Sequence, residues 1–147
     1  MLTKVYHCSL SNIGEFDFTK GVHFGGFHSA LEAALRHVYP ERWNIDTIYI
    51  HECLLDVPSD VLKEDDLGNN EAWQKYADNY LRDTNIGVLQ YINRYEPDVN
   101  PSYYVINSDL ITIKKVRKMR PYEAEAEVDA FLNYDYWSNI CIYYTLS

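Results

Sequence analysis

The order of apolar and polar positions predicts short strands in the first part of the chain. Residues 2–9 open with an apolar run that is typical of a strand. Residues 10–27 hold four of the six glycines, so we expect a loop with a short extended piece there. Residues 47–57 begin with β-branched and aromatic residues and end before Pro58, a pattern that predicts a further strand.

A helical pattern follows the glycine-rich loop. Apolar residues over 30–38 recur three and four positions apart, and Pro40 ends the pattern. Ser29 and Glu32 have the spacing of a capping box, in which each side chain satisfies the other residue's main-chain N–H. We therefore expect this helix to begin next to Ser29.

The second half of the chain predicts one more helix and then several strands. Residues 59–70 are polar and acidic and are expected to form a loop. Aromatic and apolar residues three and four apart predict a helix at about 71–82. Strands are then expected at 86–92, 103–107 and 110–116. This order favours an α+β fold over a regular βαβ repeat.

Composition and charge narrow the class of protein. A chain of 147 residues with 47% hydrophobic and 24% charged residues is typical of one globular domain. The formal net charge of −9 argues against general electrostatic affinity for nucleic acid or an anionic membrane. The 14 tyrosines argue against a disordered acidic chain.

The charge divides the chain into two parts. Five of the 13 basic residues lie within 114–120, whereas residues 121–147 contain five carboxylates and neither Lys nor Arg. We expect this acidic, Tyr-rich C-terminal extension, residues 121–147, to pack on the domain formed by residues 1–120. It is also a candidate surface for a protein partner or for self-association.

Several site and compartment classes are not expected. The cysteines Cys8, Cys53 and Cys141 are odd in number and lack metal-ligand spacing, so neither a disulfide framework nor a metal site is expected. The sequence shows no apolar run of membrane-spanning length and no signal-peptide pattern. We therefore expect a cytoplasmic protein.

Four short motifs occur in order along the chain. They are Tyr6-His7-Cys8-Ser9, Gly21-Val22-His23-Phe24-Gly25, Asn93-x-x-Glu96, and Ser102-Tyr103-Tyr104-Val105 with Leu110-Ile111 after it. In this order they resemble the ADP-ribosyltransferase superfamily, in particular its small stand-alone bacterial and phage members and related domains of polyvalent phage proteins. The resemblance covers about residues 4–116. It implies a split, mostly antiparallel β-sheet with short helices, in a bacterial or phage-infected cell.

The resemblance implies that NAD is the co-substrate. His7 would hold the nicotinamide ribose, the main chain of Cys8 would hold the carboxamide, and Ser9 would add a polar contact. His23 and Phe24 would pack on the nicotinamide ring. Cys8 stands where the family usually has glycine, and His23 where many relatives have tyrosine. The complete set of implied NAD-binding residues is His7, Cys8, Ser9, Gly21, His23, Phe24, Asn93 and Ser102.

The resemblance also implies a catalytic carboxylate. Cleaving the bond to nicotinamide develops positive charge on the ribose, which a fixed carboxylate stabilises. Because nicotinamide is already a cationic leaving group, the reaction needs no metal. Glu96 is the expected catalytic residue together with His7, and Asp98 and Glu52 are the alternatives.

Two functions of different classes remain open at this point. The resemblance implies transfer of ADP-ribose from NAD to an acceptor, expected to be a host protein, by a phage or toxin-type effector. A small molecule or a nucleobase stays open as the acceptor. The alternative is a non-enzymatic acidic protein that inhibits a basic host protein, either as a defence inhibitor or as a nucleic-acid mimic.

Overall fold

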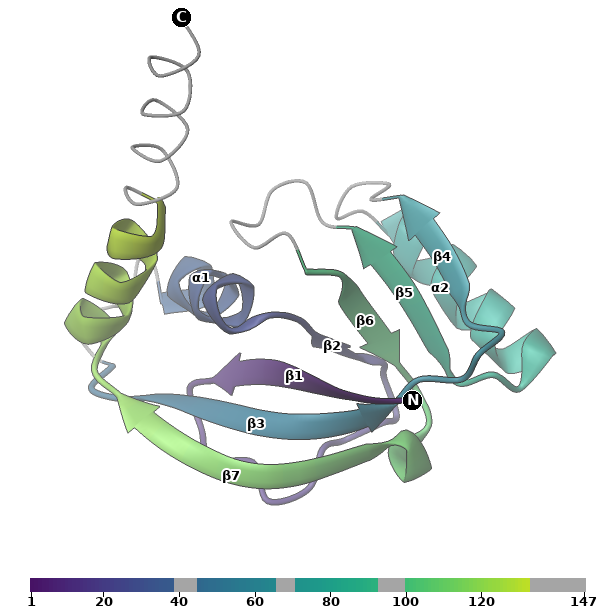
Figure 1. Ribbon diagram of the computed structural model, residues 1–147, viewed down its shortest axis with the longest axis horizontal. Helices are drawn as coiled ribbons and strands as arrows, with labels where there is room; N and C mark the ends of the chain where they lie inside the picture. Colours follow the sequence, from purple (N-terminus) through teal and green to yellow (C-terminus); the bar gives the residue numbers. More distant parts are fainter. Residues whose placement is uncertain (39–44, 66–70, 93–99, 133–147) are drawn as a thin grey trace, which may run out of the picture.

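The computed structural model describes residues 1–38, 45–65, 71–92 and 100–132. Within them the chain forms seven strands and three helices, which confirms the α+β class (Figure 1). The strands are β1 (Leu2–Ser9), β2 (Val22–Phe24), β3 (Ile48–Asp56), β4 (Leu62–Asp65), β5 (Val88–Ile92), β6 (Ser102–Val105) and β7 (Ile111–Met119). The helices are α1 (Phe27–Val38), α2 (Glu71–Thr84) and residues 121–132, with a short 3-10 helix at Ser108–Leu110.

The first sheet, which we call sheet A, has the order β1-β3-β7 and is antiparallel throughout. Its middle strand, β3, confirms the prediction for residues 47–57. The register places His7 opposite His51 and Tyr6 opposite Glu52, and it shifts between Glu52 and Cys53. The last strand of this sheet continues to Met119, three residues beyond its predicted end, because its far half pairs with the start of β3.

The second sheet, sheet B, has the order β2-β6-β5-β4. Its strands β2, β6 and β5 pair antiparallel, whereas β4 runs parallel to β5 and is joined to it through α2. The expected loop at 59–70 is therefore wrong for residues 62–65. This edge strand reads Leu-Lys-Glu-Asp, so its polar sequence has no apolar alternation, although its main chain pairs with β5.

Among the described residues, one isolated bridge connects the two sheets. Tyr6 of β1 and Gly25, just after β2, exchange both main-chain hydrogen bonds, with N···O distances of 2.8 and 3.0 Å. This is an isolated antiparallel bridge rather than a continuous ladder. The two sheets are thus joined beside Tyr6, and Figure 1 shows sheet B turning away from sheet A beyond this point.

Three apolar clusters hold the layers together. The first fills the space between the sheets, with Val5 and Cys53 from sheet A against Phe24 and Val105 from sheet B. The second packs sheet A against α1 and residues 121–132, and the third packs sheet B against α2. Each sheet therefore packs against the other sheet with one face and against a helix with its other face. Successive side chains along a strand are consequently buried on alternate faces.

The start of α1 differs from the prediction. The helix begins at Phe27, and the N–H of Ala30 donates to the carbonyl of Gly26 at 2.9 Å. Ser29 is thus inside the first turn, and its buried hydroxyl has no hydrogen-bond partner among the described residues. The expected capping box is wrong because the tertiary contact of Phe27 with Tyr6, at a centroid distance of 5.5 Å, draws the earlier residues into the helix.

The described part of the C-terminal extension packs on the domain. Residues 121–132 form a helix whose Ala124 and Val128 are buried against the α1 side of sheet A. Phe131 stacks on His28 of α1 with ring centroids 4.0 Å apart, and Glu127 lies 3.8 Å from the same imidazole. Residues 133–147 lie outside the described residues.

Candidate functional site

Four of the residues predicted to bind NAD, His7, Cys8, His23 and Phe24, lie where the two sheets meet. We call this place the β1–β2 junction, and it comprises Tyr6, His7 and Cys8 with His23, Phe24 and Gly25 opposite them. The Nδ1 atom of His7 donates to the main-chain oxygen of His23 at 2.7 Å. Since a carbonyl only accepts, Nδ1 carries the proton, and Nε2 is the accepting nitrogen whenever the ring is neutral. The tautomer and orientation of His7 are thereby set by β2.

The main chain of Cys8 lies at the open edge of β1. Tyr6 directs its N–H and C=O to Gly25, and in an antiparallel strand the groups of alternate residues point to the same edge. The N–H and C=O of Cys8 therefore face the same edge as those of Tyr6, just past the single bridge. The residue expected to hold a carboxamide through its main chain is thus located where the sheet opens.

The Cys8 side chain points the other way. It packs with Tyr6 on the α1 side of sheet A, and burial raises the pKa of the Cys8 thiol to about 12. A thiol of such high pKa stays protonated near neutral pH and is a poor nucleophile. The cysteine at this position is therefore compatible with a main-chain role and does not favour a covalent one.

An aromatic layer covers one side of His7. Phe16, from the loop before β2, meets the His7 ring edge-to-face at 5.3 Å, and Phe24 lies 5.7 Å from it. Phe16 and Phe24 contact each other at 5.1 Å. Because Phe24 is only 2% exposed, the structure places it in the core between the sheets, supporting His7.

The His23 ring lies on the other face of β2. It pairs in register with Tyr104 of β6, and their rings are 4.8 Å apart. Its Nδ1 and the Tyr91 hydroxyl share a hydrogen bond of 2.8 Å. The ring of His7 thus contacts the main-chain oxygen of His23, whereas the two imidazole rings lie on different sides of β2.

Tyr104 connects this group to α2. Its hydroxyl donates to Asp78 Oδ1 at 2.5 Å and accepts from the main-chain N–H of Gly21 at 3.2 Å. The close approach requires glycine, because a Cβ on Gly21 would overlap the Tyr104 ring. Glycine at position 21 therefore allows the main chain to come close enough to bond the Tyr104 hydroxyl.

The two predicted serines lie at the ends of their strands. Ser102 begins β6, is 3% exposed and pairs in register with Tyr91 of β5. Ser9 ends β1 on the same face as His7, and its Oγ accepts from the N–H of Ser11 at 3.3 Å. Both predicted positions thus belong to the ends of strands that frame the junction.

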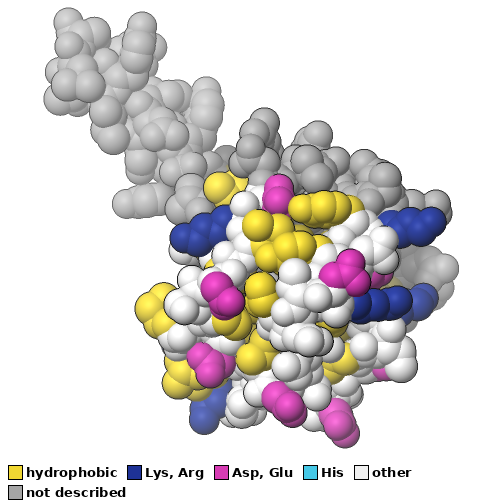
Figure 2. All heavy atoms as spheres, turned by 90° about the vertical axis from the view of Figure 1, so that its right-hand side faces the viewer, with side chains coloured by type: hydrophobic (Ala, Val, Ile, Leu, Met, Phe, Trp, Pro, Cys, Tyr) yellow, Lys and Arg dark blue, Asp and Glu magenta, His cyan; other side chains and the backbone are white. Residues whose placement is uncertain are grey.

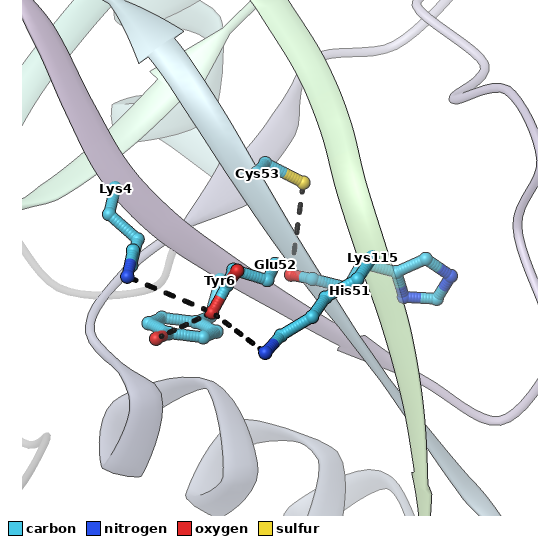
Figure 3. A network of polar contacts seen from close by, with 6 residues as sticks. All are labelled: Lys4, Tyr6, His51, Glu52, Cys53 and Lys115. Atoms are coloured by element: carbon cyan, nitrogen blue, oxygen red, sulfur yellow. Dashed lines mark hydrogen bonds and ion pairs between the residues drawn. The ribbon is translucent and has the colours of Figure 1, made fainter.

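Of the three candidate carboxylates, only Glu52 is described. Its Oε1 accepts from the Tyr6 hydroxyl at 3.3 Å and lies 4.0 Å from the ammonium groups of Lys4 and Lys115 (Figure 3). Burial, together with this carboxylate, raises the pKa of Tyr6. Since Tyr6 and His7 point to opposite faces of β1, Glu52 lies on the face away from the His7 ring. The remaining calls, Asn93, Glu96 and Asp98, fall outside the described residues.

Four residues of the site were missed by sequence reasoning. Tyr91, His51 and Asp78 stand in none of the four motifs, and Tyr104 stands in the fourth motif without a role of its own. An Asp beside the buried Ala77 on an apolar helix face was the available signal for Asp78. The contact of His51 with the loop at Ile13 spans 38 positions, so no local pattern indicates it.

The comparisons and searches returned no match. No protein-family model, curated protein or solved structure is significantly similar to this chain. Within the described ranges, no group of three or more His, Cys, Asp or Glu side chains could hold a metal ion. None of the helices described is long and apolar enough to cross a membrane.

Proposed function

We propose that the chain is an NAD-dependent mono-ADP-ribosyltransferase whose NAD site is the β1–β2 junction. The observation that carries the proposal is the position of His7 and Cys8 immediately past the single Tyr6–Gly25 bridge. A split at this place leaves the main-chain groups of Cys8 at an open edge, next to an imidazole of fixed orientation. The first two of the four motifs supply the residues of this geometry, and the third motif lies outside the described residues.

The roles of the described residues follow from their bonds. His7 would bind a ribose hydroxyl through Nε2, since Nδ1 is held by the His23 carbonyl at 2.7 Å. Cys8 would bind the carboxamide with both a donor and an acceptor of its main chain. A nicotinamide beside them would lie close to β2, where the His23 ring is oriented by Tyr91. Each contact orients NAD without needing a metal.

The carboxylate that stabilises the ribosyl cation is proposed to be Glu96. Glu52 is less suited because two lysines and a tyrosine already surround its carboxylate on the other face of sheet A. Asp78 is engaged by the Tyr104 hydroxyl and serves to position β2. Glu96→Gln should therefore abolish turnover while NAD still binds, because the amide keeps the shape and removes the charge.

The experiment is a binding measurement followed by a labelling measurement. NAD should raise the melting temperature of the chain in a concentration-dependent way, since a ligand that binds only the folded state stabilises it by mass action. Labelled NAD incubated with host lysate should then modify an acceptor or be hydrolysed. Absence of both binding and label in the wild type would overturn the proposal.

The non-enzymatic alternative predicts the opposite pattern. An acidic inhibitor would form a salt-sensitive complex with a basic protein and would ignore NAD. On the face seen from the right of Figure 1, acidic, basic and hydrophobic side chains are interspersed rather than gathered into one acidic field (Figure 2). That face therefore does not favour the mimicry of nucleic acid, and the transferase is the function that we put forward.

A further inference from the structure

A fully buried histidine joins the loop before β2 to the site. His51 of β3 is 0% exposed. Its Nδ1 donates to the main-chain oxygen of His7 at 3.0 Å, and its Nε2 accepts from the main-chain N–H of Ile13 at 2.9 Å. One neutral imidazole, with its proton on Nδ1, satisfies both bonds.

The bond to Ile13 fastens residues 10–21, which we call the β1–β2 loop. Three positions after Ile13, Phe16 packs edge-to-face on His7 at 5.3 Å and on His51 at 5.7 Å. The same loop ends at Gly21, whose main chain bonds Tyr104. Loss of the Ile13 bond therefore loosens the segment that holds Phe16 against His7.

We propose that His51 is a positioning residue that pins the β1–β2 loop over His7, and that protonation of its ring releases this loop. A proton on Nε2 would face the N–H of Ile13, so this hydrogen bond cannot form while the ring is charged. The consequence for NAD rests on the proposed function: with the loop released, Phe16 no longer supports His7, and NAD binds more weakly.

The surroundings of His51 favour its neutral form. Burial lowers the pKa of His51, although hydrogen bonds with the main chain of His7, Tyr49 and Ile13 act in the opposite direction. The titratable ring of His7 on β1 lies at a centroid distance of 6.3 Å, and Cys53 on β3 donates to the His51 carbonyl at 3.7 Å. Its register neighbour on β7 is the apolar Val116.

The charged and ionisable groups farther along β3 and the β1–β2 loop interact with other groups or with solvent. Tyr49, on the same face of β3, lies under the Lys118 ammonium at 5.9 Å. In the loop, Glu15 and Asp17 are exposed, and Asp17 accepts from both the N–H and the hydroxyl of Thr19. The described structure thus gives His51 no carboxylate partner, and lowering the pH should charge it against its surroundings.

Two substitutions separate the two bonds of the ring. In His51→Gln the side-chain carbonyl reaches the place of Nε2, so it can accept from Ile13 and does not titrate. In His51→Asn the amide nitrogen occupies the place of Nδ1, so it can donate to His7 but leaves Ile13 without an acceptor. Amide hydrogen exchange at Ile13, corrected for the intrinsic rate, directly measures the hydrogen bond between Ile13 and His51 and needs no NAD.

In the wild type, protection of the Ile13 amide should fall about tenfold per pH unit below the titration midpoint of His51, because only the neutral ring closes the loop. His51→Gln should keep the amide protected without a pH step, and His51→Asn should leave it unprotected at every pH. A wild-type amide without a pH step, or an equal step in His51→Gln, would overturn the inference. The comparison of the wild type with His51→Gln tests the inference even if His51→Asn does not fold.

The second readout is NAD affinity against pH. The wild-type dissociation constant should rise about tenfold per pH unit below the same midpoint, and it should lack that step in His51→Gln. A step that survives in His51→Gln does not arise from His51 and contradicts the link. If NAD binds at no pH, the proposed function fails, whereas the exchange result still decides whether His51 pins the loop.

Discussion

The imidazole of His7 donates from Nδ1 to the main-chain oxygen of His23 at 2.7 Å, one residue past the bridge that joins the two sheets. The side chain thereby continues the connection between β1 and β2 where the main-chain pairing has ended. The same bond sets the tautomer of His7. Structural and chemical roles of this residue are therefore coupled, and they can be separated by choice of substitution.

Substitution of His7 should split these roles. His7→Asn keeps a donor near the position of Nδ1 and removes Nε2, so we expect near-native stability but NAD turnover lowered about 100-fold or more. His7→Ala removes the donor as well and should cost a further amount of about 1 kcal/mol in unfolding free energy. Urea unfolding and NAD turnover of both variants check this, and full activity of His7→Asn would move the role elsewhere.

Gly21 should not tolerate a side chain. A Cβ there would overlap the Tyr104 ring, so Gly21→Ala should lower the unfolding free energy by about 1–3 kcal/mol. The matched control is Gly14→Ala, because a Cβ on Gly14 meets nothing within 4 Å. Equal stability of the two variants in urea would show that β2 can move away from Tyr104.

The Tyr104 hydroxyl should contribute measurably to stability. Tyr104→Phe leaves Asp78 without its donor and Gly21 without its acceptor, and we expect a loss of about 1–3 kcal/mol. Tyr122→Phe is the control, since Tyr122 is 66% exposed. Chemical denaturation distinguishes them. A Tyr104→Phe variant as stable as the control would mean that water replaces both bonds.

The described cysteines should react slowly in the native chain. Burial raises the pKa of both Cys8 and Cys53 to about 12, so little thiolate exists at pH 8. The measurement uses Cys141→Ser, which removes the third thiol, and follows iodoacetamide labelling with and without denaturant. We expect labelling to accelerate strongly on unfolding, and fast native modification of Cys8 would contradict its placement under α1.

Stability should decrease in mild acid because of His51. Its folded-state pKa lies below the ordinary value of about 6.5, so between these two values the unfolded chain binds more protons. The contribution is complete above about pH 6.5 and is lost as the pH falls through the folded-state pKa. Thermal unfolding over pH 5–8 should show this slope in the wild type, and it should be weaker in His51→Gln.

The strands with a strong apolar pattern were predictable from the sequence, and the connections between distant segments were not. The runs that became β1, β3 and β5 alternate or concentrate apolar residues, so local pattern suffices. The polar β4 is a strand only because β5 offers it a partner. The start of α1 depends on Phe27 meeting Tyr6, a contact that capping statistics do not contain.

The candidate site shows the same limit. The motifs around His7 and His23 each contain consecutive residues of the junction, so a local pattern was enough to single these segments out. The partners Tyr91 and Asp78 lie on β5 and α2, far along the chain, and only the register of sheet B brings them near β2. The catalytic role of Glu96 stays a prediction.

The central place of β3 in sheet A has a consequence for how the chain folds. Its partners are the first and the last of the described strands, so the sheet joins residues near position 2 with residues beyond 110. Contacts of such sequence separation slow folding, since long loops must close before they form. During synthesis β3 must wait for β7 with one edge uncovered, and truncation before residue 111 should yield an aggregation-prone chain.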